Sequence, residues 1–101
     1  MNFSDQTQVM KNKRMRGQIL RTLTLFYPSS TSVREVKTAL ITRGMTAGAD
    51  VTKYLCYLED KGYIRRNDGM LKDVEDDDQI ELTAKGIDLI EGTIEDPGVM
   101  I

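Results

Sequence analysis

The chain has 101 residues, of which 40% are hydrophobic and 30% charged, with a net charge of −2; this composition predicts one globular domain with a modest core. No apolar run approaches the about 20 residues of a membrane span. The first residues lack the apolar core of a signal peptide, so we expect a cytoplasmic protein without membrane contact. One cysteine excludes an internal disulfide. The lack of histidine, of a cysteine cluster and of a glycine-rich phosphate loop argues against an enzyme, a metal site or a cofactor site.

The first predicted helix covers residues 9–27, and Pro28 ends it. Apolar residues recur at helical spacing on its inner face, namely Met15, Ile19, Leu23 and Phe26, with Leu20 and Tyr27 beside them. The remaining methionines of the chain are interpreted as gap-filling core or surface side chains. Residues 1–8 are polar and are expected to be a flexible N-terminus.

A second helix is predicted from Ser32 to about Arg43. Ser32 and Glu35 have the spacing of a capping box, and the short SSTS stretch before them reads as a link. The inner positions are Val33, Val36 and Leu40, and Gly44 stands where a left-handed C-terminal cap is expected.

The third predicted helix covers residues 46–61, with Thr46 as its N-cap and Gly62 at its end. Its inward positions form a narrow arc of Val51, Leu55 and Leu58, flanked by Tyr54. At about 100° per residue, the outward positions are Ala49, Lys53, Cys56, Tyr57 and Asp60, with Asp50 and Thr52 at the sides.

Two strands, residues 63–66 and 79–82, are predicted to form a hairpin over residues 63–82, with a turn at residues 67–69. The charged stretch between them, KDVEDDD, is expected to be a solvated loop. Thr83 is the expected N-cap of a fourth helix that reaches about Gly92, with Ile87 and Ile90 inward. The tail, residues 93–101, ends in three apolar residues, and docking on the domain, docking on a partner and hanging free all stay open.

This order of elements resembles a winged helix-turn-helix domain, here over residues 9–92. LEDKGYI, residues 58–64, is similar to the end of the recognition helix in MarR- and PadR-like transcriptional regulators. LTAKGIDLIEG, residues 82–92, is similar to their step from the last wing strand into the closing helix. The resemblance implies an α+β, mostly α fold: a three-helix core, a two-stranded β-wing and a C-terminal helix.

The function that the resemblance implies is transcription regulation through binding of double-stranded DNA. The helix at residues 46–61 would enter the major groove, and the hairpin at residues 63–82 would be the wing. The implied DNA contacts are Thr52, Lys53, Tyr57, Arg65, Arg66 and Lys72. The alternative is a protein–protein interaction module, such as an adaptor or a phage-type accessory protein, that does not bind DNA.

The charge distribution keeps both functions open. Residues 1–66 hold 12 Lys and Arg against five Asp and Glu, whereas residues 67–101 hold two against 11. The outer face of the third helix lacks the Arg, Asn or Gln that make bidentate base contacts, and residues 73–78 include five acids that would repel a duplex.

The basic residues of the first helix form a positive patch of Lys11, Lys13, Arg14, Arg16 and Arg21. This patch is a source of phosphate contacts for DNA, a solvated outer face or a contact for the acidic segment of a second copy. In the last case a homodimer would form, with added contact from the apolar tail and from an outward Leu25.

Cys56 and the acidic segment each carry one further possibility. For Cys56 a redox or intermolecular disulfide role stands against a half-covered inert thiol, and the inert thiol is favoured because no basic cluster surrounds it. For the acidic segment a solvated loop is favoured over metal binding, because the spacing lacks a calcium-loop pattern.

Overall fold

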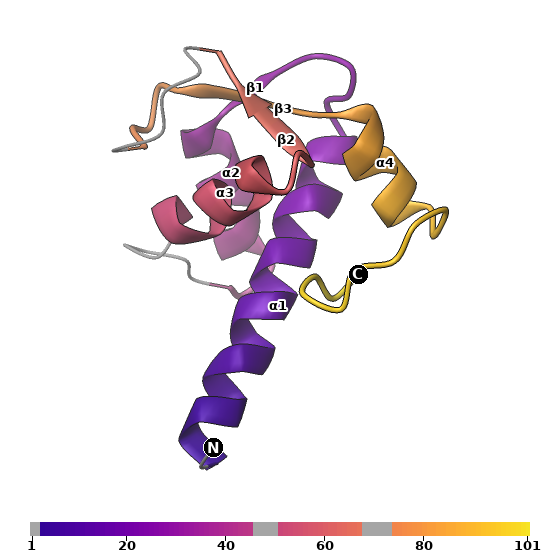
Figure 1. Cartoon of the computed structure of the whole chain (residues 1–101). Coiled ribbons are helices and arrows are strands. Elements are labelled where there is room, and N and C mark those ends of the chain that lie inside the picture. The colour runs from indigo at the N-terminus through magenta and orange to yellow at the C-terminus, as the bar shows by residue number, and fades with distance from the viewer. Residues whose placement is uncertain (1–2, 46–50, 68–73) are drawn as a thin grey trace.

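The computed structural model describes residues 3–45, 51–67 and 74–101. In these ranges the chain forms, in order, α1 (Phe3–Thr24), β1 (Thr31–Ser32), α2 (Val33–Thr42), α3 (Val51–Asp60), β2 (Ile64–Arg66), β3 (Gln79–Leu82) and α4 (Ala84–Ile90) (Figure 1). The expected α+β, mostly α architecture is confirmed. The expected start of the third helix at residues 46–50 and the turn beyond Asn67 lie outside the described residues. No helix in these ranges combines the length and the apolar character needed to cross a bilayer.

The sheet has three strands in the described residues, so the expectation of two strands was wrong. The strands are antiparallel in the order β1-β3-β2, and both outer strands pair with β3 at Ile80, which lies opposite Thr31 and Arg66. The additional strand, β1, lies in the stretch expected to be an irregular link. Two residues are too few to show the alternation that identifies a strand in a sequence.

α1 is displaced toward the N-terminus relative to the prediction. It begins at Phe3 instead of Val9, although residues 4–8 are polar, and Asp5 in its first turn suits the positive end of the helix dipole. It ends at Thr24 instead of Tyr27, and a hydrogen bond from Leu25 N to Thr22 O (3.1 Å) begins the turn that leads to Pro28. As a result, Phe26 is only half-buried and Tyr27 is exposed, so neither lies in the core as expected.

The predicted helix ends are largely confirmed. Ser32 Oγ accepts a hydrogen bond from Glu35 N at 3.1 Å, but the Glu35 carboxylate accepts from Thr31 Oγ1 and not from the Ser32 backbone. Gly44 follows α2 with a φ of 78°, a conformation that favours glycine. Thr83 caps α4 by accepting from Gly86 N at 3.1 Å.

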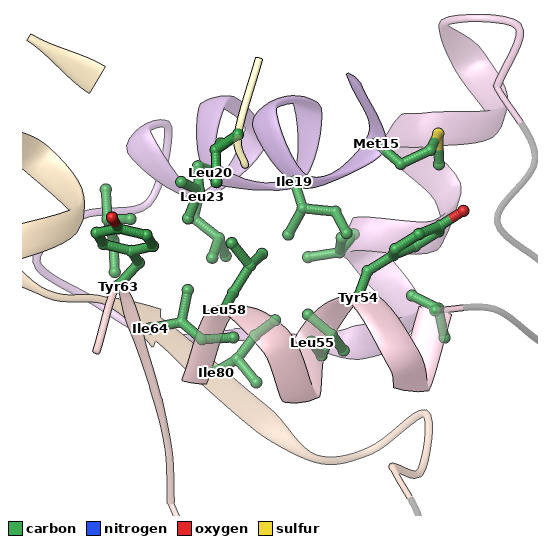
Figure 2. Packing of buried hydrophobic residues seen from close by; sticks show 14 of the residues in the cluster. Met15, Ile19, Leu20, Leu23, Tyr54, Leu55, Leu58, Tyr63, Ile64 and Ile80 are labelled. Carbon is green, nitrogen blue, oxygen red and sulfur yellow. The ribbon is translucent and has the colours of Figure 1, made fainter. Parts of the chain in front are cut away.

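The core lies where α1 crosses α2 and α3 (Figure 2). Ile19 and Leu20 of α1 are fully buried, as are the predicted inward residues of α2 and α3: Val33, Val36, Leu40, Val51, Tyr54, Leu55 and Leu58. The sheet adds Ile64, Ile80 and Leu82 to the same cluster. The helices and the two strands around the acidic segment therefore share one apolar centre, as the sequence predicts.

α4 rests on the domain mainly through Leu89, while the predicted inward residues Ile87 and Ile90 are half-buried. Gly86 lies so close to the start of β2 that a Cβ atom there would approach Tyr63 O to 2.5 Å. The chain then turns back, and its final segment lies beside the middle of α1 (Figure 1). Val99 in this segment is buried in the core cluster, so the tail docks on its own domain.

Candidate functional site

The outer face of α3 carries charges of both signs. Lys53, an expected DNA contact, is exposed, and its Nζ lies 5.4 Å from the centre of the Tyr54 ring. Thr52, beside it, is half-buried. Along the same helix follow the exposed Asp60 and the half-buried Glu59, so two carboxylates accompany the one ammonium of this helix.

Tyr57, also an expected DNA contact, does not face outward. The guanidinium carbon of Arg16 lies 3.8 Å from the centre of the Tyr57 ring, and Lys61 Nζ lies 5.6 Å from it. A Cβ atom on Gly98 would approach Tyr57 Oη to 2.2 Å, so the C-terminal segment also lies against this side chain. The outward position predicted for Tyr57 is wrong, because α1 and the tail cover that flank of α3.

Arg65 and Arg66 point to opposite sides of β2, as neighbours on a strand must. Arg65 is exposed, and its Nε donates to Glu81 Oε1 at 2.9 Å. Arg66 is only 6% exposed and pairs with Asp78 at 3.2 Å. The prediction that Arg66 contacts DNA is therefore wrong, because its guanidinium is used inside the domain, and Lys72 lies outside the described residues.

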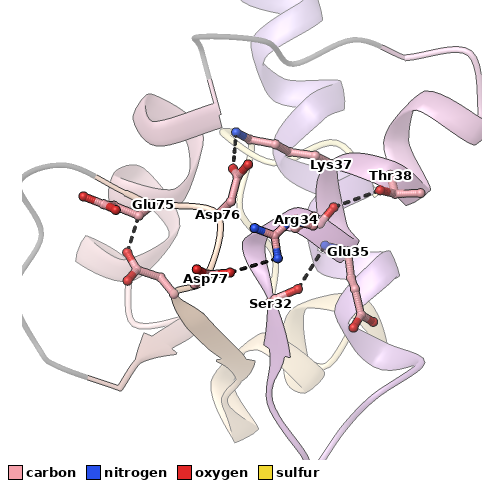
Figure 3. Close-up of polar contacts among 9 residues, drawn as sticks. Ser32, Arg34, Glu35, Lys37, Thr38, Glu75, Asp76 and Asp77 are labelled. Carbon is pink, nitrogen blue, oxygen red and sulfur yellow. Dashed lines mark hydrogen bonds and ion pairs between the residues drawn. The ribbon is translucent and has the colours of Figure 1, made fainter.

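The acidic turn, residues 75–78, docks on α2 instead of standing free as a loop (Figure 3). Lys37 Nζ contacts Asp76 Oδ1 at 2.7 Å, and Arg34 contacts Asp77 Oδ1 at 2.8 Å. The hydrogen bond and the positive charge of Lys37 lower the pKa of Asp76 below its ordinary value. Two cations of α2, the exposed Arg34 and the half-buried Lys37, are thus neutralised by the chain itself.

Backbone hydrogen bonds hold the acidic turn at the N-terminus of α2. Val33 N donates to Asp78 O and Arg34 N donates to Asp76 O, both at 3.0 Å. Together with the Ser32 cap, these bonds satisfy the first backbone donors of α2, which at other helix N-termini can bind an anion. Val74, just before the turn, packs against the core and anchors it.

The basic residues of α1 fall into two groups. Lys11, Arg14 and Arg21 are exposed, and none of them has an ion-pair partner in the part of the chain that the structure describes. Lys13 and Arg16 are half-buried and hold the tail: the Lys13 backbone carbonyl accepts from Met100 N at 3.0 Å, and the Arg16 side chain donates through Nη1 to Gly98 O at 2.9 Å. The positive patch predicted from the sequence is therefore part free surface and part internal clamp.

A hollow of about 500 Å³, here called the methionine hollow, lies beside the free basic residues of α1. Its lining includes Met10, Met15, Met45 and Met100, with Lys11 and Arg14 among the polar members. In the sequence these methionines form no group. Met10 and Arg14 are one helical turn apart, but Met45 and Met100 come from distant parts of the chain, so only the fold brings them together.

The C-terminal strap, residues 93–101, is fastened at Asp96. Tyr63 Oη and Gly98 N donate to this carboxylate at 2.6 Å and 2.8 Å, and Lys61 Nζ lies 3.4 Å away. Burial disfavours the charged carboxylate, but these donors outweigh burial and lower the pKa of Asp96. Burial, together with the hydrogen bond to Asp96, raises the pKa of Tyr63 to about 12.

A second hollow, of about 310 Å³ and here called the acidic hollow, lies at the strap itself. Its lining includes Ile94, Glu95, Asp96, Val99 and Ile101. Ile101 lines this hollow, while its neighbour Met100 lines the methionine hollow. The end of the strap therefore separates a surface with cations from a surface with carboxylates.

Cys56 is half-buried on α3. Burial raises the pKa of its thiol, and the negative charges of Asp60 and Glu59 add to this effect. A raised pKa leaves little reactive thiolate, in keeping with the inert thiol favoured from the sequence. Among the described residues, no group of three or more His, Cys, Asp or Glu side chains is arranged to hold a metal ion.

Comparison of the chain with models of protein families, with curated proteins and with solved structures finds no match. Its function must therefore be inferred from the surfaces described above.

Proposed function

We propose that this chain is a winged-helix domain that binds a protein partner and does not read duplex DNA with its α3 face. The winged-helix part is supported by the order of elements: three helices, an antiparallel pair β2–β3, and a closing helix. A short β1 that joins the sheet beside β3 and leads directly into α2 agrees with this arrangement. A fold of this kind serves either function, so the choice depends on its surfaces.

The observation that carries the proposal is the acidic turn on the N-terminus of α2. In a DNA-binding helix-turn-helix, the first of the two helices crosses the DNA backbone, and helix N-termini contact phosphates. Here the carboxylates of Asp76 and Asp77 lie at that end of α2, on Lys37 and Arg34. A phosphate would have to displace both carboxylates and overcome their negative charge.

The other charged side chains near α3 also favour a protein partner over duplex DNA. Among the described residues, Arg65 and Arg66 of β2 are paired with Glu81 and Asp78, and α3 itself carries one exposed cation, Lys53. Duplex affinity depends on neutralising several phosphates at once, so such a surface offers little of it. A surface with charges of both signs suits a protein partner, whose own charges can be complementary.

Duplex DNA binding is the second candidate, and the exposure of Lys53 and Arg65 favours it. A salt series separates the two candidates. We expect no binding to a mixed-sequence duplex even at about 50 mM salt, a condition in which phosphate contacts are strong. Duplex binding that weakens steeply with salt and disappears in Lys53→Glu, while circular dichroism shows an intact fold, would refute the proposal.

A further inference from the structure

We infer that the protein partner is a second copy of this chain, docked symmetrically at the end of the C-terminal strap. This inference rests on the proposed function, because it names the partner that a protein-binding domain of this shape would take. The surface is built from α1, the strap and residues near the end of α2, and includes none of the α3 residues considered for DNA contact.

The centre of this surface is apolar and exposed. Met100 and Ile101 are 38% and 39% exposed, although the strap that carries them is firmly fastened, and Met10 on α1 is 51% exposed. Met10 and Met100 both line the methionine hollow, and Ile101 lines the acidic hollow. Flexible methionine side chains adapt readily to a partner surface, and a centre of this kind is typical of protein interfaces.

Opposite charges flank this apolar centre. Lys11 and Arg14 line the methionine hollow, and Glu95 lines the acidic hollow. None of these three side chains has an ion-pair partner in the ranges that the structure describes. Asp96, in contrast, is already engaged with Tyr63 and Lys61.

This arrangement is complementary to itself under a two-fold rotation. In a symmetric dimer, a residue i that contacts a residue j on the partner is matched by j contacting i. An axis near the strap end would bring Arg14 of one copy toward Glu95 of the other, twice. An acidic peptide from an unrelated protein would complement only the cationic half, and an anionic membrane would be repelled by the other half, so a second copy fits best.

The strap is ordered before any partner binds. Its carboxylate anchor at Asp96, the bond from Arg16 to Gly98 O and the bond from Met100 N to Lys13 O fix the backbone up to the exposed residues. Binding to a surface that is already ordered loses less conformational entropy, which favours association through a small contact area.

Sedimentation velocity and light scattering of the full chain test the inference. We expect a dimer at micromolar concentration that dissociates as salt is added. Arg14→Glu and Glu95→Lys should each raise the dimer dissociation constant about tenfold, because an exposed ion pair contributes about threefold and each pair occurs twice. The double variant, R14E with E95K, should restore the dimer, since the two charges are exchanged.

Two controls carry the same charge changes outside the hollows. Arg21→Glu on α1 and Glu91→Lys after α4 alter exposed residues that line neither hollow, and both should dimerise as the parent does. Circular dichroism verifies the fold of each variant. A parent chain that stays monomeric at low salt, equal weakening by Arg14→Glu and Arg21→Glu, or a double variant without restored dimer would each overturn the inference.

The outcomes also separate this inference from the proposed function. A monomeric chain that binds no duplex would refute the second copy as partner and leave the protein-binding function standing. A dimer with the expected charge-swap behaviour that also binds duplex through Lys53 would refute the proposed function and leave the dimer standing.

Discussion

The guanidinium of Arg16 is stacked on the Tyr57 ring, 3.8 Å from carbon to ring centre, while its Nη1 donates to Gly98 O at 2.9 Å. One side chain of α1 thus joins α3 to the C-terminal strap, and this contact explains why Tyr57 does not lie on the outer face of α3. It also makes Arg16 the natural residue at which to measure how strongly the strap is held.

Replacing Arg16 with methionine should lower the free energy of unfolding by about 1–3 kcal/mol, because the variant loses a cation–π contact and a charged hydrogen bond but keeps an apolar stem. Urea denaturation measures this loss. The matched control is Arg21→Met on the exposed side of α1, for which we expect a change within about 0.5 kcal/mol. Equal losses of unfolding free energy in the two variants would show that the Arg16 side chain does not hold the strap.

Gly17 should be unable to accept a methyl group while the strap is docked. A Cβ atom at this position would lie 1.8 Å from Met100 O, so Gly17→Ala should release the end of the strap and increase hydrogen exchange at Val99 and Met100. In a chain that ends at Pro97, the same substitution should instead stabilise by about 0.5–1 kcal/mol, since alanine favours helix over glycine. If Gly17→Ala changed the stability of both chains equally, the strap would not lie across α1 at Gly17.

The lowered pKa of Asp96 predicts a loss of stability in acid. A carboxyl group whose pKa is lower in the folded state stabilises the fold above its unfolded pKa, about 3.9, and this stability disappears as the pH falls through the folded value. Asp96→Asn should therefore be less stable than the parent by about 1–3 kcal/mol near pH 6, and the difference should shrink as the pH falls below about 3.9. Urea midpoints across this range measure the difference. A gap that stays constant with pH would show that the charge of Asp96 is not what fastens the strap.

The two neighbouring arginines of β2 should respond differently to truncation. Arg66→Ala removes one partner of a buried ion pair and should destabilise by about 3–5 kcal/mol, whereas Arg65→Ala removes an exposed contact to Glu81 and should cost about 1 kcal/mol or less. Thermal unfolding of the two variants gives the comparison directly. Similar losses would mean that Arg66 is not enclosed as described.

Neutralising the acidic turn should create duplex binding that the parent lacks. Asp76→Asn together with Asp77→Asn frees the charges of Lys37 and Arg34, while the backbone bonds from Val33 and Arg34 keep the turn in place. Two additional phosphate contacts correspond to a slope of about −1.8 in log affinity against log salt. Glu75→Gln removes a neighbouring charge that faces neither cation and should create no binding, so fluorescence anisotropy of the two variants isolates the effect. Absence of binding in the double variant would show that the turn is not what blocks a duplex.

Much of the fold follows from local patterns. The spacing of Leu55 and Leu58, the caps at Ser32 and Thr83, and the glycine at the end of α2 all act within one or two helical turns, and the structure has each of them as predicted. The alternation of Arg65 and Arg66 likewise follows from strand geometry alone. The two-residue β1 escaped prediction because it becomes a strand only by pairing with β3.

The sequence predicted much less well which side chains are exposed or paired on the surface. Tyr57 was expected to face outward because the residues that cover its flank belong to α1 and to a tail some 40 positions later, and spacing within a helix says nothing about them. The acidic segment was expected to be a free loop because only its composition was visible. Its contact with α2 joins Lys37 to Asp76, 39 residues apart in sequence.

The sequence by itself determined which segments form helices, the pairing of β2 with β3 and most of the core residues, since burial of apolar side chains at regular spacing selects them wherever the chain folds. Only the tertiary structure decided which charges remain free. An ion pair depends on where two distant segments meet after the chain has closed on itself, and that meeting neutralises Arg34, Lys37 and Arg66 but leaves Lys11, Arg14 and Glu95 without an ion-pair partner among the described residues.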